Sequence, residues 1–185
     1  MRLAPVSLTT SRLLLRPHAE RDLASWIEAL SDREVARRLR QVPHPYTELD
    51  ARSWMTQVAE GRAIGSLQDF AITRLDNEQL IGGIGFAIGD SGVDASLGYW
   101  IARPLWGLGY AREALRRVVA YAFDELAPPL DRLEAHVHRE NPSSLRVLDA
   151  CGFTDCGCEK IPACGLDGIT VAHRYELHRG ARKVG

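Results

Sequence analysis

Apolar and polar positions recur along the chain with two periods, which predict both helices and strands. Between residues 111 and 126, apolar side chains recur at the three- and four-residue spacing of one buried helix face. Residues 97–101 form an apolar segment directly upstream and predict a strand. A turn containing Pro104, Gly107 and Gly109 separates the two. We expect the rest of the chain to be organised around this strand, turn and helix.

The same patterns predict elements on both sides of this segment. Further strands are expected at residues 13–16, 70–74, 80–88, 133–137, 154–160 and 170–178. Further helices are expected at residues 22–30, at 33–39, after Thr47 and Asp50, and after Asn141. Their order predicts an α/β (α+β) fold, in which helices flank a mixed, mostly antiparallel central sheet. One parallel crossover should run through the long helix.

Two of these helices carry recognisable end signals. Asn141 should cap the later one, with Pro142 at its first position and Gly152 closing it. The earlier one, capped by Thr47 and Asp50, is expected to stop at Gly61. Its expected buried residues are Leu49, Trp54, Met55 and Val58.

Length and composition narrow the class of protein. With 185 residues, of which 45% are hydrophobic, residues 1–185 can bury a core as a single domain. The formal net charge of −1 predicts no strong attraction to nucleic acid or to an anionic membrane. We find no apolar run of membrane-spanning length and no signal-peptide core, so we expect a cytoplasmic protein. The size is compatible with a homodimer, although the sequence does not reveal the oligomeric state.

The four cysteines lie close together near the C-terminal end, at Cys151, Cys156, Cys158 and Cys164. A zinc site would use the last three and His173, but no C-x-x-C pair is present, so we expect no metal. A disulfide is disfavoured in a cytosolic protein. We therefore expect reduced thiols.

The glycine turn before the long helix has a chemical interpretation. Glycines at a helix mouth let a ligand approach the backbone, and the first helical N–H groups lack partners there. With the helix dipole, these groups favour an anion, most often a phosphate; the alternative is a simple turn. Gly107 and Gly109 fit the first two places of the dinucleotide motif G-x-G-x-x-G, but Arg112 occupies the third. A P-loop is also excluded, because no Gly-Lys-Ser/Thr follows.

This stretch resembles the acetyl-CoA-binding motif Q/R-x-x-G-x-G/A of the GNAT acetyltransferases, with Trp106, Gly109 and Ala111 in its three places. It is most similar to the RimJ/RimL-like branch, which acetylates ribosomal-protein N-termini and commonly reads W-G-x-G-Y-A-x-E-A. Residues 141–153 resemble that branch's N-x-x-S-x-R-V-L-x-x-x-G-F signature. Residues 44–47 with Trp54 resemble its P-Y-T…W element, and residues 13–17 resemble its opening strand. The ordered set spans about residues 13–177.

The resemblance implies a GNAT fold, in which the strands near 97–101 and 133–137 splay apart as a V. The pantetheine arm of acetyl-CoA is expected in this gap, and its diphosphate on the backbone N–H groups of residues 108–112. Arg103 and Arg112 are candidates for further phosphate contacts, or else are surface arginines. The implied cofactor-binding residues are Trp100, Ile101, Ala102, Trp106, Gly107, Leu108, Gly109, Tyr110, Ala111, Arg112, Asn141 and Ser144.

The catalytic residues of the family are only partly matched. The tyrosine that protonates the leaving thiolate in many GNAT enzymes is replaced by Leu148, whereas Ser144 matches a serine of the branch and is the candidate donor to the sulfur. The glutamate that often precedes G-Y-W is replaced by Ser96. A histidine suits general-base chemistry near neutral pH. The candidate bases in its place are Asp94, Glu134, His136 and His138.

We expect an acetyl-CoA-dependent N-acetyltransferase whose acceptor is a protein or peptide N-terminal α-amine. The alternatives are a small-molecule amine acetyltransferase and an acetyl-CoA-binding module without turnover. The acceptor site is expected between the loop at residues 40–47 and the hairpin at 163–168. Tyr46 and Trp54 are candidates to line it, although Trp54 is better explained by core packing. A dinucleotide-binding domain is disfavoured, because Arg112 occupies the third glycine position of the G-x-G-x-x-G motif.

Overall fold

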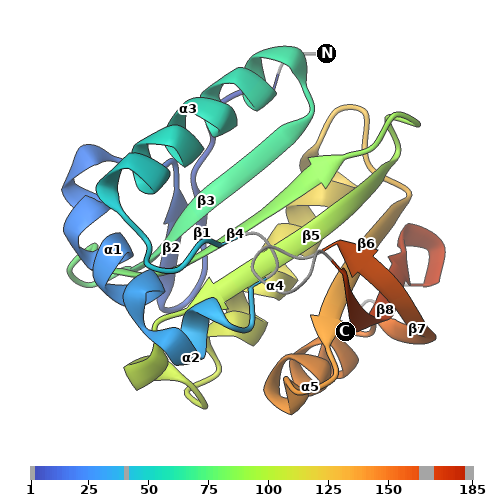
Figure 1. Cartoon of the computed structure of the whole chain (residues 1–185). Helices are drawn as coiled ribbons and strands as arrows, with labels where there is room; N and C mark the ends of the chain where they lie inside the picture. Colours follow the sequence, from blue (N-terminus) through green and yellow to red (C-terminus); the bar gives the residue numbers. More distant parts are fainter. Residues whose placement is uncertain (1–2, 40–41, 163–168, 182–185) are drawn as a thin grey trace.

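The computed structural model describes residues 3–39, 42–162 and 169–181. Its strands form one open sheet of eight, in the order β1-β2-β3-β4-β5-β6-β8-β7 (Figure 1). The strands are β1 Leu8–Thr9, β2 Leu13–Arg16, β3 Leu67–Arg74, β4 Leu80–Ile88, β5 Asp94–Ile101, β6 Arg132–His138, β7 Thr154–Pro162 and β8 Ile169–His178. The helices are α1 Leu23–Ser31, α2 Arg33–Ala36, α3 Glu48–Ile64, α4 Tyr110–Ala120 and α5 Pro142–Ala150.

Helices cover both faces of the sheet (Figure 1). The apolar stripe of α4, which includes Leu115 and Val118, packs against strand residues such as Phe70 and Ile84 in the main core. A second, smaller core lies on the other face, where Trp26 of α1 packs near Ala71. This is the predicted mixed α/β arrangement, in which the neighbouring strands are antiparallel except for one parallel pair. In the described part of the chain, no helix has both the length and the apolar character to cross a bilayer.

The parallel pair, β5 and β6, separates after three residue pairs. Ser96 opposite Glu134 is the last pair of their ladder. Beyond it, β5 continues to Ile101 against β4 alone, and β6 continues to His138 against β8 alone. The predicted V between residues 97–101 and 133–137 is therefore present.

The structure corrects two predicted helices. Thr47 and Asp50 do form a reciprocal capping box, but α3 runs past Gly61 to Ile64. Gly61 lies inside the helix, where it packs closely against β3. A Cβ at this position would be 2.5 Å from Leu67 Cβ, so the glycine is needed for packing and does not end the helix. Leu49, predicted to be buried, is 77% exposed because the sheet lies against another side of α3.

The other corrected helix follows α1. A helix was expected over residues 33–39, but α2 ends at Ala36. Asp32 caps it by accepting a hydrogen bond from the Glu34 backbone N–H at 2.8 Å. Val35 and Ala36 are buried, so this one turn packs inward even though the segment carries several arginines.

A buried ion pair joins β2 to the start of α1. Both Arg16 guanidinium nitrogens Nη1 and Nη2 contact the Asp22 carboxylate at 2.8 Å, and the Ala19 backbone N–H donates to the same group. Burial alone would raise the pKa of Asp22, but these hydrogen bonds and the Arg16 charge hold it below its ordinary value. The pair therefore stabilises the folded state only while Asp22 is ionised.

We expect Asp22→Asn to lower the free energy of unfolding by about 3 kcal/mol, because it leaves the buried Arg16 charge with only the half-exposed Glu78 carboxylate, 3.8 Å away, as an acidic partner. Urea denaturation at neutral pH measures this change. Since the folded pKa of Asp22 lies below the unfolded value, the contribution is complete at neutral pH and is lost as the pH falls below about 4. Asp76→Asn, at the exposed Arg74 pair, is the control and should lower the free energy of unfolding far less than Asp22→Asn does. Equal losses for the two variants would contradict the prediction.

Candidate active site

The glycine turn predicted from the sequence opens α4. Gly107 and Gly109 have φ of +79° and +83°, values that residues with a Cβ rarely adopt. The helix begins without a side-chain cap, and no described group accepts a hydrogen bond from the N–H groups of residues 110–112. Open space surrounds the Cβ position of Gly107, and Arg12 Nη2 lies 3.5 Å from that of Gly109. These free N–H groups, at the positive end of the helix dipole, form an anion site.

Arg12, which sequence analysis did not single out, braces this turn. Its guanidinium donates to the Leu108 carbonyl oxygen at 3.1 Å, pairs with Glu113 at 2.6 Å and stacks over the Tyr110 ring at 4.5 Å. Burial would raise the pKa of Glu113, but hydrogen bonds from Thr10 and Arg12 hold it below its ordinary value. Arg12 and Leu108 are 96 residues apart, so no local pattern indicates this contact.

One cavity of about 1130 Å³ extends from the helix mouth, past the V, to the sheet face covered by α1, α2 and α3. It brings together most of the predicted site residues. The predicted residues that line it are Trp100, Ile101, Trp106, Gly107, Gly109, Tyr110, Ala111, Arg112, His136, Asn141 and Ser144. The predicted cofactor-binding and catalytic residues that do not line it are Ala102, Leu108, Asp94, Glu134 and His138.

The turn after β5 is held by hydrogen bonds that change the role of one predicted residue. Ala102 donates its backbone N–H to the Ile81 carbonyl oxygen at 2.8 Å, so this N–H is not free for a ligand. The Trp106 indole donates to the Ile101 carbonyl oxygen at 2.7 Å, and the Arg38 guanidinium lies 4.3 Å from the Trp106 ring centroid. Trp106 therefore fixes the shape of the turn and forms part of the cavity wall.

Ser144 lies in the first turn of α5, on the other side of the V. Asn141 caps this helix by accepting from the Ser144 backbone N–H at 3.3 Å, and Pro142 occupies the first position as predicted. The Ser144 hydroxyl is 2.7 Å from the Tyr99 hydroxyl of β5. Burial raises the pKa of Tyr99, so its phenol keeps its proton at neutral pH. Leu148, in the place of the family's tyrosine, is fully buried and cannot act on the cavity.

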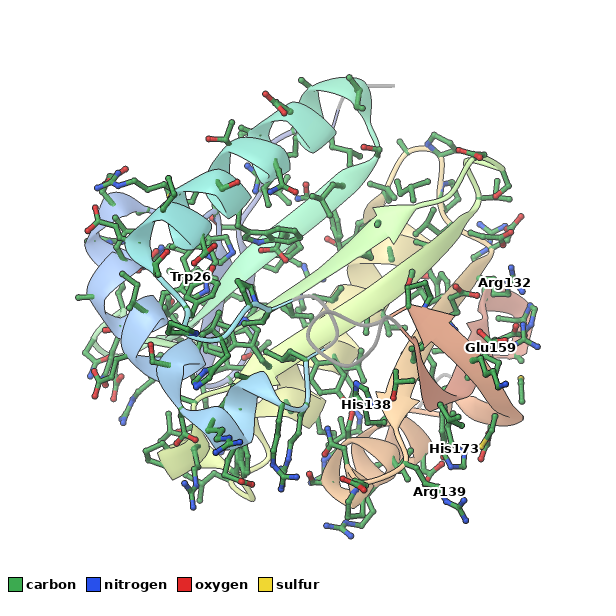
Figure 2. The ribbon with its side chains drawn as sticks, in the orientation of Figure 1. Trp26, Arg132, His138, Arg139, Glu159 and His173 are labelled. Atoms are coloured by element: carbon green, nitrogen blue, oxygen red, sulfur yellow. The ribbon has the colours of Figure 1, made fainter. Side chains whose placement is uncertain are left out.

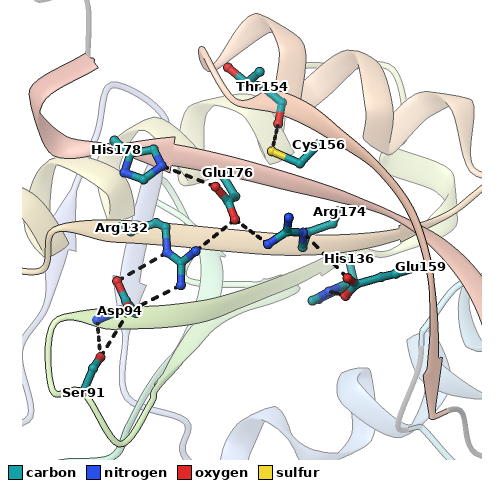
Figure 3. A network of polar contacts seen from close by, with 10 residues as sticks. All are labelled: Ser91, Asp94, Arg132, His136, Thr154, Cys156, Glu159, Arg174, Glu176 and His178. Carbon is teal, nitrogen blue, oxygen red and sulfur yellow. Dashed lines mark hydrogen bonds and ion pairs between the residues drawn. The ribbon is translucent and has the colours of Figure 1, made fainter.

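His136 is the one candidate base that lines the cavity. Its Nε2 lies 2.6 Å from Glu159 Oε1 of β7, and Arg174 of β8 contacts the same carboxylate at 3.7 Å (Figure 3). Its other ring nitrogen, Nδ1, is buried without a hydrogen-bond partner among the described residues. Glu159 therefore fixes the orientation of the imidazole.

The other candidate bases lie outside the cavity. Asp94 is at the paired end of the V, where Arg132 and Ser91 engage its carboxylate, each at 3.3 Å (Figure 3). Glu134 forms the last rung of the parallel ladder. His138 lies at the end of β6, near α5, with Nδ1 3.3 Å from the Thr170 hydroxyl (Figure 2). These positions separate Asp94 and Glu134 from the open part of the V.

Sequence analysis missed Asp69, which lines the far side of the cavity, and His18, which contacts Asp69 from outside the cavity lining. Asp69 of β3 accepts hydrogen bonds from His18 Nε2 at 2.5 Å and from the Trp54 indole at 3.3 Å. The His18 ring stacks on Trp26 at 4.3 Å, and Trp26 lies between α1 and the sheet (Figure 2). Burial, with the charges of Asp50 and Asp69, raises the pKa of Tyr46. Trp54 thus both packs on the second core and lines the cavity.

The expected acceptor site is only partly described. From the loop at residues 40–47, Val42, Pro43 and Tyr46 line the cavity. Residues 40–41 and the tip of the expected hairpin, 163–168, lie outside the described residues.

The cysteine cluster shows no metal geometry in the part of the chain that is described. Cys151, Cys156 and Cys158 are free thiols, and Cys164 lies outside the described residues. No group of three or more His, Cys, Asp or Glu side chains within residues 3–39, 42–162 and 169–181 could hold a metal ion.

The residues at the helix mouth and in the V fit acetyl-CoA. The unpartnered N–H groups of residues 110–112 suit a diphosphate, and Arg112 lines the cavity beside them. Arg103, in contrast, contacts Asp32 at 3.6 Å. The unpaired edge of β5, residues 97–101, offers backbone groups to the amides of a pantetheine arm.

Comparisons with known proteins agree with this fit. Residues 12–154 match the model of the acetyltransferase (GNAT) domain. An uncharacterized N-acetyltransferase, p20, from Bacillus licheniformis is 31% identical over 149 residues, which cover 80% of this chain and 82% of p20.

Solved structures are similar over nearly the whole chain. A GNAT-family acetyltransferase from Bacillus anthracis superposes with a TM-score of 0.81 at 23% identity, covering 95% of this chain and 99% of that one. Mycobacterium smegmatis RimJ, in complex with CoA-disulfide, gives a TM-score of 0.79 at 22% identity, with coverages of 94% and 88%. The chain therefore belongs to the GNAT family of N-acetyltransferases, which use acetyl-CoA as the acetyl donor.

Proposed function

We propose that this enzyme transfers the acetyl group directly to a primary amine in a ternary complex, and that its preferred acceptor is a protein or peptide N-terminal α-amine. The observation that carries the proposal is the single cavity that joins the anion site of α4, the V and the sheet face under α3. Because donor and acceptor regions share one cavity, both substrates can be bound together without a covalent enzyme intermediate.

The proposed chemistry needs little from a base. Bound acetyl-CoA supplies an activated acetyl thioester. An α-amine has an ordinary pKa of about 8, against about 10.4 for lysine, so more of it is neutral at pH 7. We propose that His136, held by Glu159, accepts the proton that the amine loses. His138 is the weaker candidate, because it does not line the cavity.

Ser144 is the proposed hydrogen-bond donor to the leaving sulfur. The Tyr99 hydroxyl lies 2.7 Å from the Ser144 hydroxyl and can donate a hydrogen bond to the Ser144 oxygen. The Ser144 O–H is then free to donate a hydrogen bond to the leaving sulfur. Tyr99 then acts as a positioning residue, and the pair compensates for the leucine at position 148.

A second candidate acceptor is a small amine. Among similar solved structures, one is a ribosomal-protein-S5-alanine acetyltransferase from Vibrio fischeri and another is a spermidine N-acetyltransferase from Vibrio cholerae. Both are 20% identical or less, so they support the fold and leave the acceptor class open. The carboxylate of Asp69 lines the cavity and could bind the positive charge of a small amine, which supports this alternative.

The acceptor class is tested by thiol release from acetyl-CoA over a panel of amines. Peptides with small N-terminal residues should give the highest kcat/KM. Blocking the α-amine of the same peptide by formylation is the matched control and should remove the activity. Higher kcat/KM for small amines than for every peptide would overturn the peptide proposal, and tight acetyl-CoA binding without any thiol release would indicate a binding module.

We expect Gly109→Glu to weaken acetyl-CoA binding by about 100-fold or more, because it strains the backbone and places a carboxylate beside the phosphate site. Isothermal calorimetry with acetyl-CoA measures the change. Gly92→Glu is the matched control, since Gly92 also has a positive φ of +74° and lies in the turn between β4 and β5. Unchanged affinity in Gly109→Glu, or equal loss in both variants, would count against the site.

Ser144→Ala is expected to lower kcat by roughly 10- to 100-fold while the Kd for acetyl-CoA changes little, because only the donor to the leaving sulfur is lost. Steady-state kinetics and calorimetry report the two quantities. Ser143→Ala, which removes the neighbouring hydroxyl that donates to Asn141 at 2.8 Å, is the comparison and should retain nearly full kcat. A Ser144→Ala enzyme with wild-type kcat would rule out the role.

A further inference from the structure

Two paired glycines form a strip of bare backbone that crosses the sheet from the V towards Asp69. Gly98 of β5 pairs with Gly85 of β4, and Gly85 pairs with Asp69 of β3. Residues opposite one another in neighbouring strands point to the same face, so these three share the face that carries α1, α2 and α3. All three line the cavity. Asp69 is therefore the first side chain that a ligand meets when it extends from the V along this strip.

Only one oxygen of the Asp69 carboxylate is engaged. Its Oδ1 accepts from His18 Nε2 and from the Trp54 indole. Its Oδ2 lies over Gly85, 2.3 Å from the position that a Cβ would occupy there, and has no hydrogen-bond partner among the described residues. Any side chain at position 85 would displace this oxygen.

Among the described residues, the one basic side chain that contacts the Asp69 carboxylate is His18, and it contacts only Oδ1. His18 Nδ1 is buried without a described hydrogen-bond partner, so the described polar contact of this ring is the one from Nε2 to Asp69 Oδ1. The Arg62 guanidinium donates to the Asp69 backbone carbonyl at 3.0 Å and to Gln68 at 3.2 Å, and forms no ion pair with the carboxylate. Asp69 is only 9% exposed, so leaving one oxygen of its carboxylate without a hydrogen-bond partner is unfavourable. The contacts with His18 and Trp54 use Oδ1 alone, so they leave Oδ2 available to a ligand in the cavity.

We propose that Asp69 binds a second, positively charged nitrogen of the acceptor while the first nitrogen reacts at the V. This proposal rests on the proposed amine acetyltransferase activity and adds the acceptor's chemical class, an amine with two cationic nitrogens joined by a short linker. Neighbouring strands are about 4.8 Å apart. Because Oδ2 lies over β4, the bound cation is about one strand spacing from β5. Trp54 and Tyr46 of the same cavity provide aromatic walls for a cation.

Two sources present this chemistry: a small diamine, and a peptide whose second residue is lysine. The test measures KM and kcat for diaminobutane against butylamine, and for a peptide with lysine against one with norleucine at the second position. In at least one arm, the dicationic acceptor should have the lower KM. Asp69→Asn should raise that KM about tenfold, the loss expected for one charge-assisted hydrogen bond, and leave the monocationic KM nearly unchanged. The arm that responds identifies the source.

Asp90→Asn, the same chemical change in the exposed turn between β4 and β5, is the control and should leave both values unchanged. No preference for a dication in either arm, or an equal loss for mono- and dicationic acceptors in Asp69→Asn, would overturn the proposal. Calorimetric titration of each acceptor into the complex of the protein with CoA measures acceptor binding without turnover. It therefore tests the Asp69 cation site separately from the proposed acetyl transfer. If no amine releases thiol, an Asp69-dependent preference for the dication in binding still supports the cation site, while the transferase proposal fails.

Discussion

The site depends on one constraint, the loss of pairing between β5 and β6 beyond Ser96 and Glu134. Each strand keeps its other neighbour, so the sheet stays intact while the edges that face the gap lose their hydrogen bonds. Unpaired backbone inside a protein is unfavourable unless water or a ligand satisfies it. The lost pairing between β5 and β6 thus lowers stability locally. It also leaves backbone groups that can hydrogen-bond an amide-rich ligand in the gap.

The two walls of this groove are built differently and supply different chemistry. β5 leads through a short turn into α4, whose first N–H groups have no described partner and are suited to bind an anion. β6 leads into α5, whose first turn holds Ser144 next to Tyr99 of the opposite wall. The Tyr99–Ser144 contact therefore joins the two walls across the V. The face under α3 contributes the remaining part, with backbone glycines as its floor.

How far the sequence could predict this differs from part to part, for physical reasons. The strand, turn and helix around Gly107 and Gly109 follow from local spacing, because their signals lie within one short segment. The end of α3 could not be read locally, since Gly61 resembles a helix stop until Leu67 of β3 is known to pack on it. His18 and Asp69 are 51 residues apart, and neither lies in a motif. Only the tertiary fold brings the loop after β2, with His18, onto Asp69 of β3.

The contact of Arg12 with the mouth of α4 has a consequence for the start of the chain. Glu113, in the first turn of α4, accepts hydrogen bonds from Thr10 and Ser11 as well as from Arg12. These contacts hold the segment before β2 against the turn that opens α4, where we propose that the phosphates bind. Any free energy that a bound nucleotide gives to that turn must, by thermodynamic reciprocity, also restrain this segment. Protease protection of the first strand would then be a direct readout of donor occupancy, without any assay of chemistry.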